Sequence, residues 1–184
     1  MTAPIQKSIL GIAGEFAVAA ELCRRNIYAQ LTLGNLKRVD LLTMSQQGQL
    51  LKIEVKAKQS RTWANIKGIS AADGFLVFVD FANRSDTTRP DFFILTAEDW
   101  LRLATAHVSE YNRRKNASLK AYVDQENCPV YPTEITSYGK PYRGCSVRLQ
   151  TIAQHHEAWT KILDKCVRVT EGQTDNASNG ASAT

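Results

Sequence analysis

Hydrophobic and polar residues alternate along two neighbouring segments in the first third of the chain, a pattern typical of a β-hairpin. Residues 39–44 form one apolar segment and residues 50–57 form the next, with Gly48 in the turn between them. Successive side chains of a strand point to opposite faces. The second segment therefore directs one set of side chains to each face, Leu51, Ile53, Val55 and Ala57 to the first and Lys52, Glu54 and Lys56 to the second.

The turn also predicts how the two segments pair. If residues 46–48 form the loop, counting back from it places Asp40 opposite Glu54. Like charges directly across a ladder destabilise a sheet unless a positive group lies between them. Mg²⁺ prefers one or two carboxylates plus water, so the pair predicts a metal site with Lys56 on the same face. The alternative interpretation is the solvent-exposed face of an amphipathic hairpin without metal.

Residues 4–26 have the apolar period of an α-helix. Glu21 falls opposite the apolar stripe, where we expect it in solvent, whereas Glu15 lies at the border of the stripe. Glu15 fits either an ordinary boundary carboxylate or a functional group that acts with the hairpin carboxylates. Gly11 and Gly14 inside the helix predict close approach of another backbone or a ligand. The stripe that we expect to face the core contains Ile5, Ile9, Ile12, Phe16, Ala19 or Ala20, and Cys23.

The rest of the chain predicts further strands and helices around this hairpin. The apolar run at residues 75–81 is short enough for a buried central strand, and residues 92–95 form the next strand. Thr96, with Asp99 three residues on, is typical of the cap of a helix that continues to about residue 114. We further expect a long loop at residues 123–144, a last strand at 145–149 and a helix at 151–166.

The acidic and basic residues of these segments follow an order that resembles the PD-(D/E)XK nuclease superfamily. Gly14-Glu15 lies on the first helix, Val39-Asp40 stands where the family has Pro-Asp, and Glu54-Val55-Lys56 follows on the next strand. The match covers roughly residues 8–95, and residues 63–93 are also similar to small uncharacterised bacterial members. The resemblance implies an α/β fold, with a restriction-endonuclease-like mixed twisted sheet of four to six strands flanked by helices.

The resemblance also implies a role for each motif residue. Asp40, Glu54 and the carbonyl of Val55 would bind Mg²⁺, with Mn²⁺ as a substitute. Lys56 would be the catalytic lysine and Glu15 the supporting helix carboxylate. The implied activity is metal-dependent hydrolysis of phosphodiester bonds in DNA by an endonuclease. Because the family commonly works as dimers or higher oligomers, a homo-oligomer is a further expectation.

The charge of the chain agrees with a polyanionic partner. Lysine and arginine outnumber acidic residues, giving a formal net charge of +5. Basic patches of this kind are typical of nucleic-acid binding, although a solvated basic surface has the same composition. The residues that we expect to contact DNA near the hairpin are Lys37, Arg38, Lys58, Arg61 and Lys67.

Composition and length favour one soluble domain. The chain has 184 residues, 43% of them hydrophobic, and no apolar run approaches the roughly 18 residues of a membrane span. Its start lacks the pattern of a signal peptide and its four cysteines are scattered, so we expect reduced thiols and a cytoplasmic location. We expect residues 1–170 to form the nuclease-like domain. Residues 171–184 are polar and lack aromatic side chains, so we expect a disordered tail.

Two other functions fit the same residues. The first is a nuclease-like module that binds nucleic acid without cutting it. The paired carboxylates argue against this function, because a pure binding module does not need them. The second is a protein-interaction module, such as an immunity factor, in which the hairpin is amphipathic and holds no metal. Metal binding distinguishes this module from the nuclease.

Overall fold

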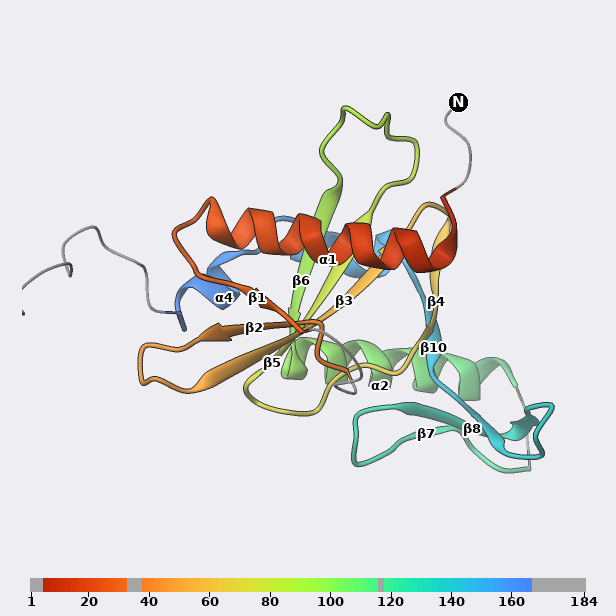
Figure 1. The fold of residues 1–184 in the computed structure, drawn as a ribbon. Helices are drawn as coiled ribbons and strands as arrows, with labels where there is room; N and C mark the ends of the chain where they lie inside the picture. Colours follow the sequence, from red (N-terminus) through yellow and green to blue (C-terminus); the bar gives the residue numbers. More distant parts are fainter. Residues whose placement is uncertain (1–4, 33–37, 116–117, 167–184) are drawn as a thin grey trace, which may run out of the picture.

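The computed structural model describes residues 5–32, 38–115 and 118–166, and its centre is a mixed five-stranded sheet (Figure 1). The strand order is β1-β2-β3-β5-β6, with β3 and β5 parallel and the other neighbours antiparallel. Helices flank this sheet, so the predicted α/β class with four to six strands is confirmed. The strands are β1 (Gln30–Leu31), β2 (Leu41–Met44), β3 (Leu50–Lys58), β5 (Gly74–Asp80) and β6 (Asp91–Thr96).

Two apolar layers cover the two faces of the sheet. Helices α1 (Lys7–Cys23) and α4 (Thr160–Leu163) pack on one face, where Val18 and Ile162 join the inward side chains of β3. Helix α2 (Ala97–Arg114) covers the other face together with a separate ribbon of two strands. That ribbon consists of β4 (Thr62–Ile66) and β10 (Cys145–Arg148).

The central strand and the helix that follows β6 lie where the sequence predicts them. Every residue of β5 is buried, which explains its continuous apolar sequence. Helix α2 begins with a capping box, because the Thr96 hydroxyl accepts from the Asp99 amide while the Asp99 carboxylate accepts from the Thr96 amide. These reciprocal bonds satisfy two amides at the helix start.

The prediction for the buried face of α1 is wrong. Its core face contains Leu10, Gly14, Val18 and Leu22, whereas the stripe from Ile5 to Phe16 is exposed. Both faces are apolar, and the one with the small Gly14 fits closer to the sheet. A Cβ on Gly14 would lie 2.8 Å from the Cβ of Ala57, so the close approach expected there is confirmed, while Gly11 has open space around it.

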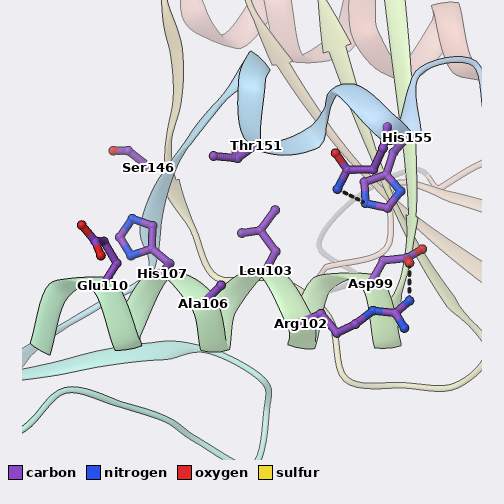
Figure 2. Close-up of a pocket in the computed structure, with 10 residues that line it drawn as sticks. Asp99, Arg102, Leu103, Ala106, His107, Glu110, Ser146, Thr151 and His155 are labelled. Carbon is purple, nitrogen blue, oxygen red and sulfur yellow. Dashed lines mark hydrogen bonds and ion pairs between the residues drawn. The ribbon is translucent and has the colours of Figure 1, made fainter. Parts of the chain in front are cut away.

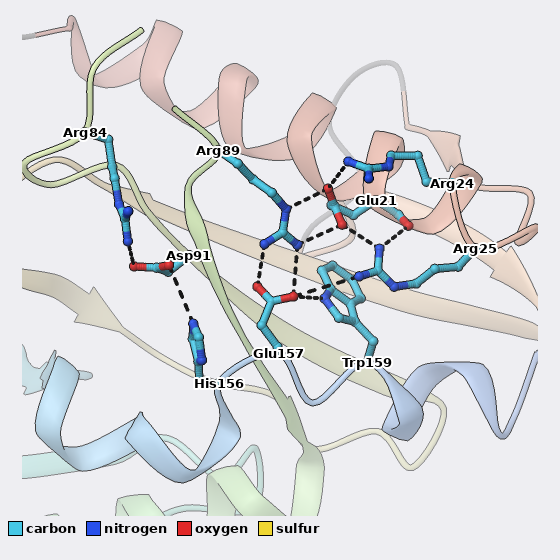
Figure 3. A network of polar contacts seen from close by, with 9 residues as sticks. All are labelled: Glu21, Arg24, Arg25, Arg84, Arg89, Asp91, His156, Glu157 and Trp159. Atoms are coloured by element: carbon cyan, nitrogen blue, oxygen red, sulfur yellow. Dashed lines mark hydrogen bonds and ion pairs between the residues drawn. The ribbon is translucent and has the colours of Figure 1, made fainter. Parts of the chain in front are cut away.

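The expectation that Glu21 lies in solvent is also wrong. Its carboxylate is buried and accepts hydrogen bonds from Arg25 and Arg89, and Arg89 reaches onward to Glu157 (Figure 3). This network joins the end of α1 to the loop before β6 and to the segment before α4. Opposite charges and several donors offset the loss of hydration of the buried carboxylate.

The C-terminal third differs most from the prediction. The expected loop at 123–144 contains a small sheet, and the expected helix at 151–166 is divided into three short turns. None of the helices among the described residues is long and apolar enough to cross a membrane. The predicted tail at 171–184 lies outside the described residues. The elements are β7 (Tyr122–Val123), β8 (Pro129–Ile135), β9 (Pro141–Arg143), α3 (Leu149–Ile152), a 3₁₀ turn (Ala153–His155) and α4.

Candidate metal centre

The β2–β3 hairpin has the predicted register. Leu41 pairs with Ile53 and Met44 pairs with Leu50, and Asp40 directly precedes the first paired residue of β2. The Asp40 amide donates to the Ile53 carbonyl at 2.9 Å, which holds this residue against β3 just before β2 begins.

The Asp40 side chain also forms a hydrogen bond to β3. One carboxylate oxygen, Oδ2, accepts from the Val55 amide at 2.6 Å. In a strand the N–H and C=O of one residue point to the same edge, so the Val55 carbonyl points to the edge that Asp40 occupies. A carboxylate and a backbone carbonyl therefore share one edge of β3.

Glu54 is the buried member of the pair, with only 5% of its side chain exposed. Its Oε1 lies 2.8 Å from the Nζ of Lys56, whereas Oε2 is buried without a hydrogen-bond partner among the described residues. Burial raises the pKa of Glu54, the Lys56 ammonium opposes that change, and Asp40 adds to it. Because buried polar atoms are nearly always satisfied, this oxygen marks a place where a cation fits.

Glu15 reaches the same region from α1. Its pKa is raised by burial and by the charge of Asp40, and the charge of Lys56 lowers it. The charges of Asp40 and Lys56 therefore both affect the pKa of Glu15, as expected for a helix carboxylate at the border of the apolar stripe.

A cavity of about 500 Å³ opens over Glu54 and Lys56. Arg38 precedes the hairpin, Lys67 follows β4, and Arg143 ends β9, so three separate segments bring cations to one opening. Two of these cations are paired in this structure, because Glu126 lies 3.3 Å from Arg38 and 3.5 Å from Arg143. Asn65 completes the lining.

The other basic residues predicted to contact DNA are placed differently. Arg61 is exposed in the turn between β3 and β4, away from the cavity lining, and Lys37 lies outside the described residues. The expectation for Lys58 is wrong. Its ammonium is buried 2.6 Å from an Asp80 carboxylate oxygen and 4.3 Å from the Trp63 ring centroid, so it cannot contact a ligand at the surface.

Sequence reasoning missed Asn65 and Glu126 as lining residues, whereas the sequence does offer Arg143, with the tyrosines of residues 123–144, as a nucleic-acid contact. Arg143 lies beyond the matched motif, and the hydrophobic pattern around it predicts a loop. The small sheet carries it to the cavity, where its guanidinium also lies 2.5 Å from Asp124. The signal for Arg143 is its place beside Tyr142, since tyrosine and arginine are typical of nucleic-acid contacts.

A second, larger cavity of about 640 Å³ lies between α2 and α3. Figure 2 shows Leu103 and Ala106 of α2 facing Thr151 of α3 across it. Its two acidic residues are already paired, Asp99 with Arg102 and Lys161, and Glu110 with arginines of its own helix. This cavity therefore lacks the opposed carboxylates of the hairpin.

The ligand set of the hairpin suits a cation that retains water. No cluster of three or more His, Cys, Asp or Glu residues that could hold a metal occurs within the described part of the chain. Mg²⁺ does not require such a cluster, because it is typically bound through one or two carboxylates and keeps several waters. Asp40, Glu54 with its unpaired buried oxygen, and the Val55 carbonyl fit that preference.

Comparison with known proteins does not by itself assign a function to this chain. No family model matches the chain, and no curated protein matches it. Among solved structures the chain is similar to a bacterial homing endonuclease, with 16% sequence identity and a TM-score of 0.39. The similarity covers 51% of this chain and 71% of the other, and it is too distant to assign individual residues.

Proposed function

We propose that this protein is a metal-dependent DNA endonuclease of the PD-(D/E)XK superfamily, with residues 1–170 as its catalytic domain. The observation that carries the proposal is that Asp40 and Glu54 bring two carboxylates together at the end of the β2–β3 ladder, with Lys56 beside them. A buried Glu54 oxygen has no partner among the described residues, and the Lys56 ammonium stands 2.8 Å from the other oxygen. A surface hairpin without metal would leave both carboxylates hydrated, whereas Glu54 is buried and Lys56 pairs with only one of its oxygens, so a bound cation would offset the burial of the other.

Asp40, Glu54 and the Val55 carbonyl would hold Mg²⁺, or Mn²⁺ in its place. When bound, the ion would neutralise charge on the scissile phosphate and lower the pKa of a water molecule. The Asp40–Val55 hydrogen bond fixes the orientation of one carboxylate before the substrate arrives. Lys56 keeps about a third of its side chain exposed to the cavity, so its ammonium can donate to a phosphate oxygen or orient the attacking water.

The cations that line the cavity would bind the DNA backbone around the scissile bond. Arg38, Lys67 and Arg143 surround the opening above Glu54. Guanidinium groups recognise phosphates by paired hydrogen bonds, and a phosphate can replace the Glu126 carboxylate between Arg38 and Arg143. Contacts to phosphates position a duplex without reading its sequence.

The proposal is tested by cleavage of plasmid DNA with Mg²⁺ or Mn²⁺. We expect wild-type protein to nick or cut it and Lys56→Ala to abolish cleavage while the protein remains folded. Lys52→Ala is the matched control, because Lys52 lies on the same face of β3 but pairs with Asp73 and is absent from the cavity lining. The assignment of Lys56 is wrong if Lys56→Ala cuts as fast as wild type.

The two alternative functions predict different results when DNA binding and metal binding are measured beside cleavage. A non-catalytic binding module would retain DNA with an affinity that falls steeply with salt, but would leave it intact. A protein-interaction module would bind neither DNA at low ionic strength nor metal.

A further inference from the structure

Helix α1 presents an apolar face to solvent that no described part of the chain covers. Ile9, Ile12 and Phe16 are 53%, 48% and 59% exposed, and Ile5, just before the helix, is 40% exposed. Ala20 and Cys23 continue the same face to the end of the helix and are also exposed. Figure 1 shows α1 as the outermost layer on its side of the sheet. We call these six residues the α1 seam.

The spacing of the α1 seam is that of a helix-pairing surface. Its members are three or four residues apart, which keeps them on one stripe along the helix. Scattered single hydrophobics on a surface are ordinary, but a contiguous stripe marks an interaction site. The α1 seam is separate from the metal centre and does not depend on the proposed function.

We propose that the α1 seam binds the α1 seam of a second copy of this chain, with the two helices antiparallel. The side chains of the seam are large from Ile5 to Phe16 and small at Ala20 and Cys23. Antiparallel pairing about a two-fold axis between Ile12 and Phe16 sets these two large side chains against each other at the centre and large against small at both ends. Ile9 then faces the partner's Ala20, and Ile5 faces the partner's Cys23. Such a self-complementary patch is what a two-fold dimer interface requires.

Charge and area point to the same occupant. The six residues carry no charge, so the α1 seam offers nothing to a phosphate backbone and its own side chains bring no like charges together in a pair of copies. Complete burial of two facing seams would remove at most on the order of 1,000 Å² from water, which is the lower bound for a specific interface. An interface of this size fits a dimer that dissociates on dilution.

Sedimentation analysis over a dilution series tests the interface. We expect wild-type protein to pass from dimer to monomer, and Phe16→Glu to raise the dissociation constant by more than about tenfold, as for a central interface residue. Ile135→Glu is the matched control, because Ile135 is also 59% exposed but lies on β8. A wild-type protein that stays monomeric at all concentrations, or equal effects of the two substitutions, would overturn the proposal.

Cysteine cross-linking tests the antiparallel orientation of the two α1 helices independently of the stability of the dimer. Two proteins are prepared in a Cys23→Ser background, one with Ile9→Cys and one with Ala20→Cys. The other three cysteines are buried and do not interfere. Antiparallel helices predict a disulfide-linked dimer only when the two proteins are mixed. Cross-linking of each protein alone, or none in the mixture, would contradict the antiparallel seam. Neither experiment measures cleavage, so its result is independent of the nuclease proposal.

Discussion

At the scale of single residues, the two oxygens of Glu54 have different environments. Oε1 is paired with Lys56, while Oε2 is buried with no partner among the described residues. Burial is the main cause that raises the Glu54 pKa, and Asp40 adds to it. Without metal, the folded protein therefore binds the Glu54 proton more tightly than the unfolded chain does. Above the ordinary glutamate pKa, ionisation of Glu54 then costs stability.

Neutralising either carboxylate should therefore stabilise the metal-free protein. In EDTA at neutral pH, we expect Asp40→Asn and Glu54→Gln to raise the free energy of unfolding by about 0.5–1 kcal/mol, the scale of cross-strand pairs. For Glu54→Gln the gain should vanish below about pH 4, where Glu54 is protonated in both folded and unfolded states. Millimolar Mg²⁺ or Mn²⁺ should raise the melting temperature of wild type and leave both variants nearly unchanged.

Thermal melts of the three proteins with EDTA and with metal provide the measurement. Glu98→Gln, which changes a highly exposed carboxylate on α2, should keep the full response to metal. If both hairpin variants are destabilised in EDTA and wild type ignores metal, the two carboxylates are structural.

Glu21 shows the opposite pKa behaviour because its carboxylate has cationic partners. The hydrogen bond from Arg89 is the main cause that lowers the Glu21 pKa, to about 2, and Arg25 contributes further (Figure 3). A lowered carboxylate pKa stabilises the fold above the unfolded pKa of about 4.3, and this stability is lost as pH falls toward 2.

We therefore expect Glu21→Gln to lose about 2 kcal/mol at pH 7, the scale of hydrogen bonds to charged groups. The variant should also lose stability less steeply than wild type between pH 5 and about pH 2. Urea unfolding at several pH values measures both effects. Glu110→Gln is the control, because Glu110 pairs with Arg113 and Arg114 on the surface of α2, where water screens the interaction. Equal effects of the two substitutions would contradict a special role for the buried network.

At the scale of elements, the hairpin could be predicted and the orientation of α1 could not. A strand repeats every two residues, so a short turn determines the register and the face of Glu54. Helix α1 is apolar on two stripes, and its period does not say which stripe is buried. The burial of Lys58 could not be predicted from the strand pattern either. The alternation places it on the Glu54 face, but only the pairing of β3 with β5 brings Asp80 beside it and covers it.

The close fit of Gly14 against β3 gives a prediction for this packing. Gly14→Ala gains up to about 1 kcal/mol of helix propensity, but its Cβ would lie 2.8 Å from Ala57, and overpacking costs about 1–3 kcal/mol. We expect net destabilisation in urea unfolding. Gly11→Ala, with open space around the new methyl group, should instead stabilise by about 0.5–1 kcal/mol. If Gly14→Ala is as stabilising as Gly11→Ala, α1 does not pack this tightly on the sheet.

At the scale of the whole molecule, α1 connects the proposed dimer to the proposed metal centre. Glu15 projects roughly 100° from the middle of the α1 seam, at about 100° per residue. The two-fold axis of an antiparallel helix pair runs perpendicular to the plane of the two helices. A side chain that points along this axis on one copy points the same way on the other. Both metal centres would therefore lie on the same side of the dimer, beside one duplex.

This arrangement predicts that the dimer cuts both strands of a duplex, and the prediction rests on both proposals. At protein concentrations above the dimer dissociation constant, wild type should convert supercoiled plasmid to linear DNA. Phe16→Glu should accumulate nicked circles at the same concentration, because its metal centre is intact but acts alone. Ile135→Glu should behave like wild type. Linearisation by Phe16→Glu under conditions where sedimentation finds it monomeric would show that one centre cuts both strands. An absence of any cleavage would instead contradict the nuclease proposal and leave the sedimentation result standing.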